Sequence, residues 1–251
     1  MHNAYTYNWF LVGLSFLVSV FGSYTGLQLV RAVRSADPGS KKTWILAAAI
    51  ALGGGAIWTM HFIGMLAFDM GVPVSYDPIK TLMSLLIAVV VVGAGIVVVS
   101  SNDRSVSRLI GGGVIMGLGV AGMHYSGMAA MNSVATMTYD PVFFSASIII
   151  ALVAATAALW LAFNLEGNTQ LIGAAFVMGI AVCGMHYTGM YGMIMSHDHS
   201  GALAVQDGIK PLTLGLFIFC FSMLLLVLSL IVTLSQLNKK MYAALEAEDD
   251  E

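Results

Sequence analysis

One short stretch occurs three times in this sequence: TMHFIGM at Thr59–Met65, GMHYSGM at Gly122–Met128 and GMHYTGM at Gly184–Met190. Each copy holds a Met-His-aromatic triplet that is followed, one residue later, by Gly-Met. The histidines, 63 and 62 residues apart, are His61, His124 and His186. A fixed period of this size indicates a repeated structural unit. We therefore interpret the three copies as one site to which three equivalent elements contribute.

The composition indicates a membrane protein. Of the 251 residues, 59% are hydrophobic and 9% are charged, whereas soluble domains carry about 25% charged residues. Several apolar runs of about 20 residues are each long enough to cross a bilayer, so the lipid bilayer is the first expected partner. The sequence has no basic patch of the kind that binds nucleic acid. Its two cysteines, Cys183 and Cys220, lie in apolar stretches and do not indicate a disulfide framework.

Seven apolar spans are predicted, at about 8–30, 44–68, 79–100, 108–131, 142–164, 170–195 and 211–235. The first lacks a basic leader and a small-residue cleavage site, so we expect a retained helix and not a signal peptide. The expected fold class is an all-α integral membrane protein with seven transmembrane helices, arranged as one leading helix plus three repeated helix pairs. We expect one domain over 1–238 and a charged cytoplasmic tail, or a truncated linker, over 239–251.

The positions of Lys and Arg predict the orientation of the spans. Eight of the ten lie on one side, at the first and third connections and after the last span, and two lie on the other. The N-terminus is therefore expected outside and the C-terminus in the cytoplasm. The motifs then fall on the spans at 44–68, 108–131 and 170–195, which all run outward. Each histidine lies 16 or 17 residues into its span, so all three should reach one depth near the outer boundary of the bilayer.

The residue types of the motif point to a soft metal ion. On a helix, a histidine and the methionine four residues later share a face. The methionines at this spacing are Met65, Met128 and Met190, while those directly before the histidines, at the margin of the same face, are Met60, Met123 and Met185. Imidazole and thioether ligands together suit copper, and Cu(I) above all. Histidines inside membrane helices are functional by default, although a packed structural histidine is the alternative.

Four further side chains are auxiliary candidates for this metal site. His2 precedes the first span, and His197 and His199 flank Asp198 in the last outer loop. They could capture metal at the surface, although a solvated polar loop explains them equally well. Cys183 lies three residues before His186 on the same side of the helix, where it is either a soft ligand or a small core residue.

The loops and the motif glycines extend the repeat. Tyr76-Asp77-Pro78 and Tyr139-Asp140-Pro141 precede the third and fifth spans, with Asp suited to a helix N-cap and Pro to the first turn. The motif glycines, which should give room for a close helix or a small ligand, are Gly64, Gly127 and Gly189.

The stretches Met123-His124-Tyr125-Ser126 and Met185-His186-Tyr187-Thr188 resemble the signature of the MHYT domain family, and the resemblance covers nearly the whole chain. The first copy departs from it as Met60-His61-Phe62-Ile63 but keeps the Met and the His. The family is a bacterial membrane module with seven spans and motifs near the outer face of three of them. The resemblance implies a sensory domain of the bacterial inner membrane that binds copper and perceives a diatomic gas such as O2, CO or NO.

The resemblance also implies partners. Family members often carry cyclic-di-GMP synthesis or hydrolysis domains, kinases or DNA-binding regulators after the last span. A cytoplasmic output domain or signalling partner is therefore expected, and the chain is either a stand-alone member or cut from a longer protein. The oligomeric state is left open by the sequence; a homodimer is one option, since membrane sensors that drive paired output domains are often dimers.

The leading hypothesis is a copper-binding sensor and not an enzyme, but other functions remain open. Three histidines can hold zinc with an open position for water, as in a membrane metal-dependent hydrolase. Two of the histidines could instead ligate a b-type haem. A transporter or channel is disfavoured because charges inside the spans are scarce. A retinal protein is disfavoured because no lysine lies in the middle of a span.

Overall fold

The computed structural model describes residues 6–100, 105–133, 135–165, 167–197, 208–225, 227–228 and 231. His2, His199 and the tail 239–251 lie outside the described residues. The helices are α1 (Trp9–Ser35), α2 (Lys41–Ala49), η1 (Ile50–Trp58, a π-helix), α3 (Thr59–Leu66), α4 (Pro78–Val99), α5 (Val106–Met128), α6 (Pro141–Asn164) and α7 (Asn168–Tyr191). The strands are β1 (Thr6–Tyr7), β2 (Phe68–Asp69), β3 (Ser75–Tyr76), β4 (Met131–Asn132), β5 (Ala135–Tyr139) and β6 (Met193–His197).

Six spans are long and apolar enough to cross a membrane, and α2, η1 and α3 together form one of them, Lys41–Leu66. A shorter apolar helix, Pro211–Leu225, lies where the seventh span is expected. The helical, multi-pass membrane fold is therefore confirmed, whereas the count of seven and the orientation stay predictions. The three motif spans end two to four residues earlier than expected, because short strands begin there.

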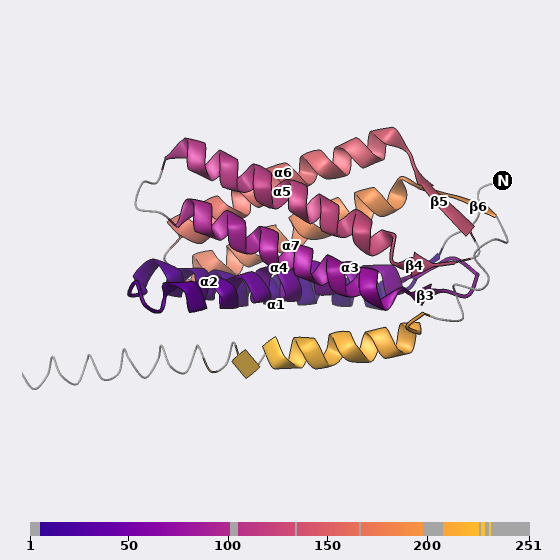
Figure 1. Cartoon of the computed structure of the whole chain (residues 1–251), viewed down its shortest axis with the longest axis horizontal. Coiled ribbons are helices and arrows are strands. Elements are labelled where there is room, and N and C mark those ends of the chain that lie inside the picture. Colours follow the sequence, from indigo (N-terminus) through magenta and orange to yellow (C-terminus); the bar gives the residue numbers. More distant parts are fainter. Residues whose placement is uncertain are drawn as a thin grey trace, which may run out of the picture.

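The six spans form a closed ring. Each span contacts the next one along the chain, and α1 contacts α7 to close the ring. Figure 1 shows the spans running along the long axis of the molecule. The motif helix α3 also contacts α5 and α7, and His124 of α5 meets His186 of α7, so the motif helices line the interior. Glycines permit this packing: a Cβ on Gly117 would lie 2.7 Å from Leu152 Cα, and one on Gly53 would lie 2.6 Å from the Ala88 carbonyl oxygen. Small residues thus allow neighbouring backbones to approach closely, as in other membrane bundles.

The π-helix η1 lies directly before the first motif and departs from the regular helix expected there. It contains the triplet Gly53-Gly54-Gly55, and the Thr59 hydroxyl donates a hydrogen bond to the Gly54 carbonyl oxygen over 2.8 Å. A Cβ on each of the three glycines would meet a different neighbour: Ala88, Phe221 and Leu225. The backbone is therefore crowded on several sides, a setting in which only glycine fits. Wide π-turns of this kind are rare and concentrate near functional sites.

All three strand pairs repeat one arrangement at the end of the bundle, here named the strand end (Figure 1). The pairs are β1 with β2, β3 with β4, and β5 with β6. Next to them, α1, α4 and α6 begin at the N-caps Asn8, Asp77 and Asp140, whose side chains accept hydrogen bonds from amides two and three residues later. The Asp77 and Asp140 caps predicted from sequence are thus confirmed.

The N-cap residues also join each unit to a motif helix. The backbone N–H groups of Asn8, Asp77 and Asp140 donate to the carbonyl oxygens of Ala67, Ala130 and Gly192, over 2.8, 2.7 and 2.8 Å. Each acceptor lies six residues after a motif histidine. The bundle therefore consists of three equivalent units, and α1 is the outer helix of one of them.

This pairing differs from the expected leading helix plus three pairs. The helix α1 is structurally equivalent to α4 and α6. The additional helix is Pro211–Leu225, which packs on the outside of the second span. Trp58 contacts Phe217 and Phe221 of that helix, with ring centroids 6.1 and 6.3 Å apart. The likeness of Tyr7-Asn8 to Tyr-Asp-Pro is hidden in the sequence, because Asn replaces Asp and Trp9 replaces Pro.

Candidate metal centre

The three motif histidines meet at the centre of the ring. Their Nδ1 atoms are 3.0 Å apart for His61 and His186, 3.1 Å for His61 and His124, and 3.3 Å for His124 and His186. All three side chains are buried, with at most 1% of their surface exposed. Among the described residues they form the only group of three His, Cys, Asp or Glu side chains close enough to hold one ion. Three elements thus bring one ligand atom each to a single point.

The motif glycines fix the outer side of this histidine triad. A Cβ on Gly127 would collide with Nε2 of His61, and the same holds for Gly189 with His124 and for Gly64 with His186. Each imidazole therefore lies against the glycine of another motif, in a cyclic order around the axis. The expected close approach is found here, and glycine is required because the imidazole occupies the space of a side chain.

The triad cannot satisfy its own hydrogen-bonding groups. A neutral imidazole has one N–H and one lone pair. The three Nε2 atoms are buried without a hydrogen-bond partner among the described residues, while the three Nδ1 atoms face one another. If all three Nδ1 atoms carry lone pairs, three acceptors meet; with mixed tautomers an Nδ1–H can donate to a neighbouring Nδ1, but the three Nε2 atoms still have no partner in the described part of the chain. A cation at the centre accepts all three lone pairs, so this set of ligands fits a metal ion.

The size of the triad fits a metal ion as well. The separations of the three Nδ1 atoms place the point equidistant from them about 1.8 Å from each. A typical metal–imidazole bond is about 2.0 Å long. A small widening of the triangle is enough to reach that length. The histidines therefore match the ligand number and spacing of a compact three-nitrogen site.

The six motif methionines are all in the core around the triad, and none is more than 2% exposed. That their thioether sulfurs bind the metal remains a prediction. Of the auxiliary candidates, Cys183 is half-buried on α7 and does not belong to the histidine group. His197 ends β6 at the strand end, where it pairs with Ala135. His2 and His199 lie outside the described residues.

Three serines that the sequence analysis missed form hydrogen bonds with aromatic residues in the motifs or directly before them. The Tyr125 hydroxyl is 2.7 Å from the Ser147 hydroxyl, and the Tyr187 hydroxyl is 2.9 Å from the Ser15 hydroxyl. Because both serine hydroxyls donate to a backbone carbonyl oxygen three residues earlier, each tyrosine is the donor to its serine. In the first copy, where Phe62 has no hydroxyl, Trp58 Nε1 donates to Ser84 instead, over 3.0 Å.

A regular spacing marks these serines in the sequence. Ser15, Ser84 and Ser147 each lie seven residues after an N-cap, which is Asn8, Asp77 or Asp140. Seven residues are close to two turns of helix, so each serine lies on the same face as its cap and points to the neighbouring motif helix. This repeated distance is the signal that could have identified them.

A second layer of aromatic rings covers the triad at the strand end. The strand residues Tyr7, Tyr76 and Tyr139 lie over the motif aromatics Tyr187, Phe62 and Tyr125, at centroid distances of 5.9, 6.0 and 5.1 Å. Burial, and after it the neighbouring Tyr187, raises the pKa of Tyr7 to about 12. Burial, and after it Tyr125, likewise raises the pKa of Tyr139 to about 12. These hydroxyls stay neutral at physiological pH, so the cover is aromatic and uncharged.

The three carboxylates described at the strand end are engaged elsewhere. Asp77 and Asp140 cap helices, and the Asp69 carboxylate accepts a hydrogen bond from the Gly71 amide over 2.8 Å. The histidine group itself contains no carboxylate among the described residues. Its ligand set is therefore neutral.

Comparison with known proteins identifies the family of the chain. Residues 54–112 and 117–175 each match the MHYT family, described as a bacterial signalling protein N terminal repeat. The bifunctional diguanylate cyclase/cyclic di-GMP phosphodiesterase MucR of Pseudomonas aeruginosa is 43% identical over 74% of this chain. The signaling protein YkoW of Bacillus subtilis is 34% identical over 88%, and the cyclic di-GMP phosphodiesterase NbdA of Pseudomonas aeruginosa is 36% identical over 84%.

The chain spans less than a third of each of these relatives, 28%, 29% and 27% of their lengths. No solved structure matches the chain. Each family match runs from a motif helix through the outer helix that follows it, which is the helix pair expected from the sequence, whereas the hydrogen bonds at the strand end join each motif helix to a different outer helix. The chain therefore belongs to the MHYT family of bacterial signalling proteins.

Proposed function

We propose that this chain is a membrane sensory domain that binds one copper ion through the histidine triad and signals its state to the cytoplasm. The observation that carries the proposal is the convergence of three fully buried Nδ1 atoms at 3.0–3.3 Å from one another. A bound copper ion supplies an electron-rich centre that binds small diatomic ligands. The ligand perceived is an apolar gas such as O2, CO or NO.

The charge of the site supports Cu(I) over a divalent ion. Burying an ion without a counter-charge is costly, and the cost rises with the charge. The triad offers three neutral nitrogens, and the nearby motif methionines offer neutral, soft thioethers. A monovalent, soft ion fits such surroundings better than Zn²⁺, which would bring two uncompensated charges into the bundle.

The two rival functions find less support. A zinc hydrolase needs a base beside the metal-bound water, and the described histidine group contains no carboxylate. A haem would have to pass between two axial histidines, whose nitrogens here are only 3.0–3.3 Å apart. Neither has an observation of its own in its favour.

A packed chain of aromatic rings supports the last helix as the route of the signal. The His61 ring contacts Phe62 at 4.9 Å between centroids, Phe62 contacts Trp58 at 4.7 Å, and Trp58 contacts Phe221 at 6.3 Å. A shift of His61 can therefore act on Pro211–Leu225, the helix that leads toward the C-terminus. We propose that residues 1–238 form the sensory domain and that 239–251 lead to a cytoplasmic output partner.

The setting of the domain follows the family. We propose the bacterial inner membrane, with the strand end outside, and a homodimer that drives a paired output. MucR is named for making and degrading cyclic di-GMP, and this chain matches 28% of it. We infer that such catalysis belongs to parts of those relatives that this chain does not cover, and that this chain is not itself the enzyme.

The test is the metal content of purified protein after reconstitution with Cu(I). Wild type should hold one copper per chain, and His61→Ala, His124→Ala and His186→Ala should each lose it. The control Met83→Ala, at an exposed position of α4, should keep it. Zinc retained in preference to copper would favour the hydrolase, and copper retained in all three variants would refute a shared triad site.

A further inference from the structure

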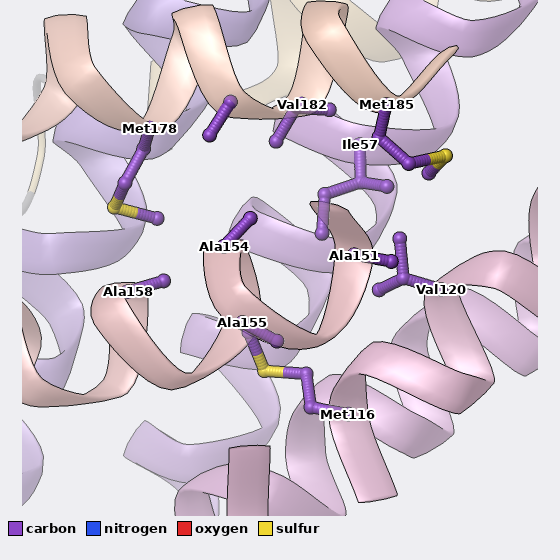
Figure 2. Close-up of a pocket in the computed structure, with 11 residues that line it drawn as sticks. Ile57, Met116, Val120, Ala151, Ala154, Ala155, Ala158, Met178, Val182 and Met185 are labelled. Atoms are coloured by element: carbon purple, nitrogen blue, oxygen red, sulfur yellow. The ribbon is translucent and has the colours of Figure 1, made fainter. Parts of the chain in front are cut away.

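A cavity of about 30 Å³ lies inside the bundle between η1, α5, α6 and α7. Figure 2 shows Ala154 and Ala158 of α6 facing Met178 and Val182 of α7 across it, with Met116 and Val120 of α5 on a third side. The other lining residues are Ile57, Ala151, Ala155, Ala181 and Met185. All eleven side chains are apolar.

The cavity lies directly beneath the histidine triad. Ile57, Val120 and Val182 each precede a motif histidine by four residues, which is one helical turn or roughly 6 Å along the axis. Met185 lines the cavity and is adjacent in sequence to His186. The triad thus has its aromatic cover on the strand side and this cavity on the other side.

The chemistry of the walls selects the occupant. A buried water needs two to four polar partners, and apolar cavities instead stay dry and bind apolar atoms such as xenon. One water needs about 10–15 Å³, so a cavity of about 30 Å³ has room for a molecule larger than one water. An apolar diatomic molecule meets both conditions.

Alanines of α6 leave this space open, and the repeat shows which side chains could fill it; the matching positions of α1 are also small, Gly22 and Ser23. Ala155 lies fifteen residues after the N-cap Asp140, and the matching residue after Asp77 is Val92 of α4. Ala154 likewise matches Val91. Val92 is fully buried against its neighbours, so the corresponding position in α4 carries the two methyl groups that Ala155 lacks.

The wall between α6 and α7 is not fully buried. Ala154, Ala181 and Val182 are each partly exposed, although they also line the cavity. Diatomic gases such as O2, NO and CO are apolar enough to dissolve in hydrocarbon. A gas can therefore enter from the bilayer, without crossing the aromatic cover at the strand end.

We propose that this cavity binds an apolar diatomic gas, which enters between α6 and α7 and is held one helical turn from the histidine triad. This deepens the proposed function and rests on it for its biological meaning. The binding itself depends on the walls of the cavity alone, so it is expected with or without metal.

Xenon under pressure is the probe, and the methyl groups of the methionines are the reporters. In metal-free protein labelled with ¹³C-methyl methionine, xenon should shift the Met116 and Met178 signals saturably. Met83, which is 52% exposed on the lipid-facing surface, should show only a weak linear response from xenon dissolved in detergent. Ala155→Leu should abolish the saturable shift, and Ala157→Leu, on the exposed face of the same helix, should leave it unchanged.

The outcomes separate this proposal from the copper site. If Met116 and Met178 respond no more than Met83, or if Ala155→Leu keeps the full response, the cavity proposal is wrong. Copper content is measured in parallel. Xenon binding without copper binding would overturn the proposed function and support the cavity proposal. Copper binding without xenon binding would support the proposed function and overturn the cavity proposal. Ala155→Leu should keep one copper per chain, which also shows that the variant is folded.

Discussion

Gly127→Ala tests the contact that orients the triad. The added Cβ would collide with Nε2 of His61, and the imidazole must retreat by about 1 Å to restore van der Waals separation. Metal sites tolerate errors of about 0.2 Å in ligand distance, and loss of a supporting contact typically costs 10–100-fold in metal affinity. We therefore expect the affinity for Cu(I) to fall at least about tenfold.

The effect on folding should be smaller than the effect on metal. Overpacking costs about 1–3 kcal/mol, whereas replacing glycine by alanine in a helix gains about 1 kcal/mol. The net loss in free energy of unfolding is thus about 0–2 kcal/mol. Gly127→Ala should therefore lower the affinity for Cu(I) more than it lowers the free energy of unfolding. This difference distinguishes a local defect at the triad from a global loss of stability.

The matched control is Gly122→Ala on the same helix. A Cβ at Gly122 has no atom within 4 Å, so only the gain in helix propensity remains. Cu(I) affinity is measured by competition with a coloured chelator, and stability by thermal unfolding in the same detergent. If Gly127→Ala binds Cu(I) within twofold of Gly122→Ala, the glycine does not orient His61 and the reasoning is refuted.

Three further predictions concern the repeat and the signal. Asp140→Ala removes an N-cap and should lower the free energy of unfolding by about 1 kcal/mol; an unchanged melting temperature would contradict this. Trp58→Phe removes the donor to the buried Ser84 oxygen and should cost about 1 kcal/mol, while Trp160→Phe, at an exposed position, serves as the neutral reference. Phe221→Ala is tested in a fusion of 1–238 to the output part of a relative, where it should make the output independent of copper without changing the copper content. If Phe219→Ala, at an exposed position, weakens the response of the output to copper equally, the aromatic route is wrong.

The sequence was sufficient for the membrane class, the repeat and the identity of the three histidines. Apolar runs long enough to span a bilayer are a local property of composition, and evenly spaced motifs are visible without coordinates. The two Asp N-caps also followed from local chemistry, because Asp before Pro satisfies the free amides at a helix start. The role of α1 could not be predicted in this way, since Asn8 and Trp9 lack the Asp-Pro pair that identifies its counterparts.

Only the tertiary structure decided how these parts meet. The sequence placed three histidines at one depth, but the 3.0–3.3 Å separation of their Nδ1 atoms depends on ring closure by α1 and on the glycines against which the imidazoles lie. The replacement of a tyrosine hydroxyl by Trp58 Nε1 at Ser84, and the cavity beneath the triad, arise from contacts between spans far apart in the chain. Local sequence sets which residues a helix presents, whereas the distances between side chains of different helices are fixed by how the whole ring packs.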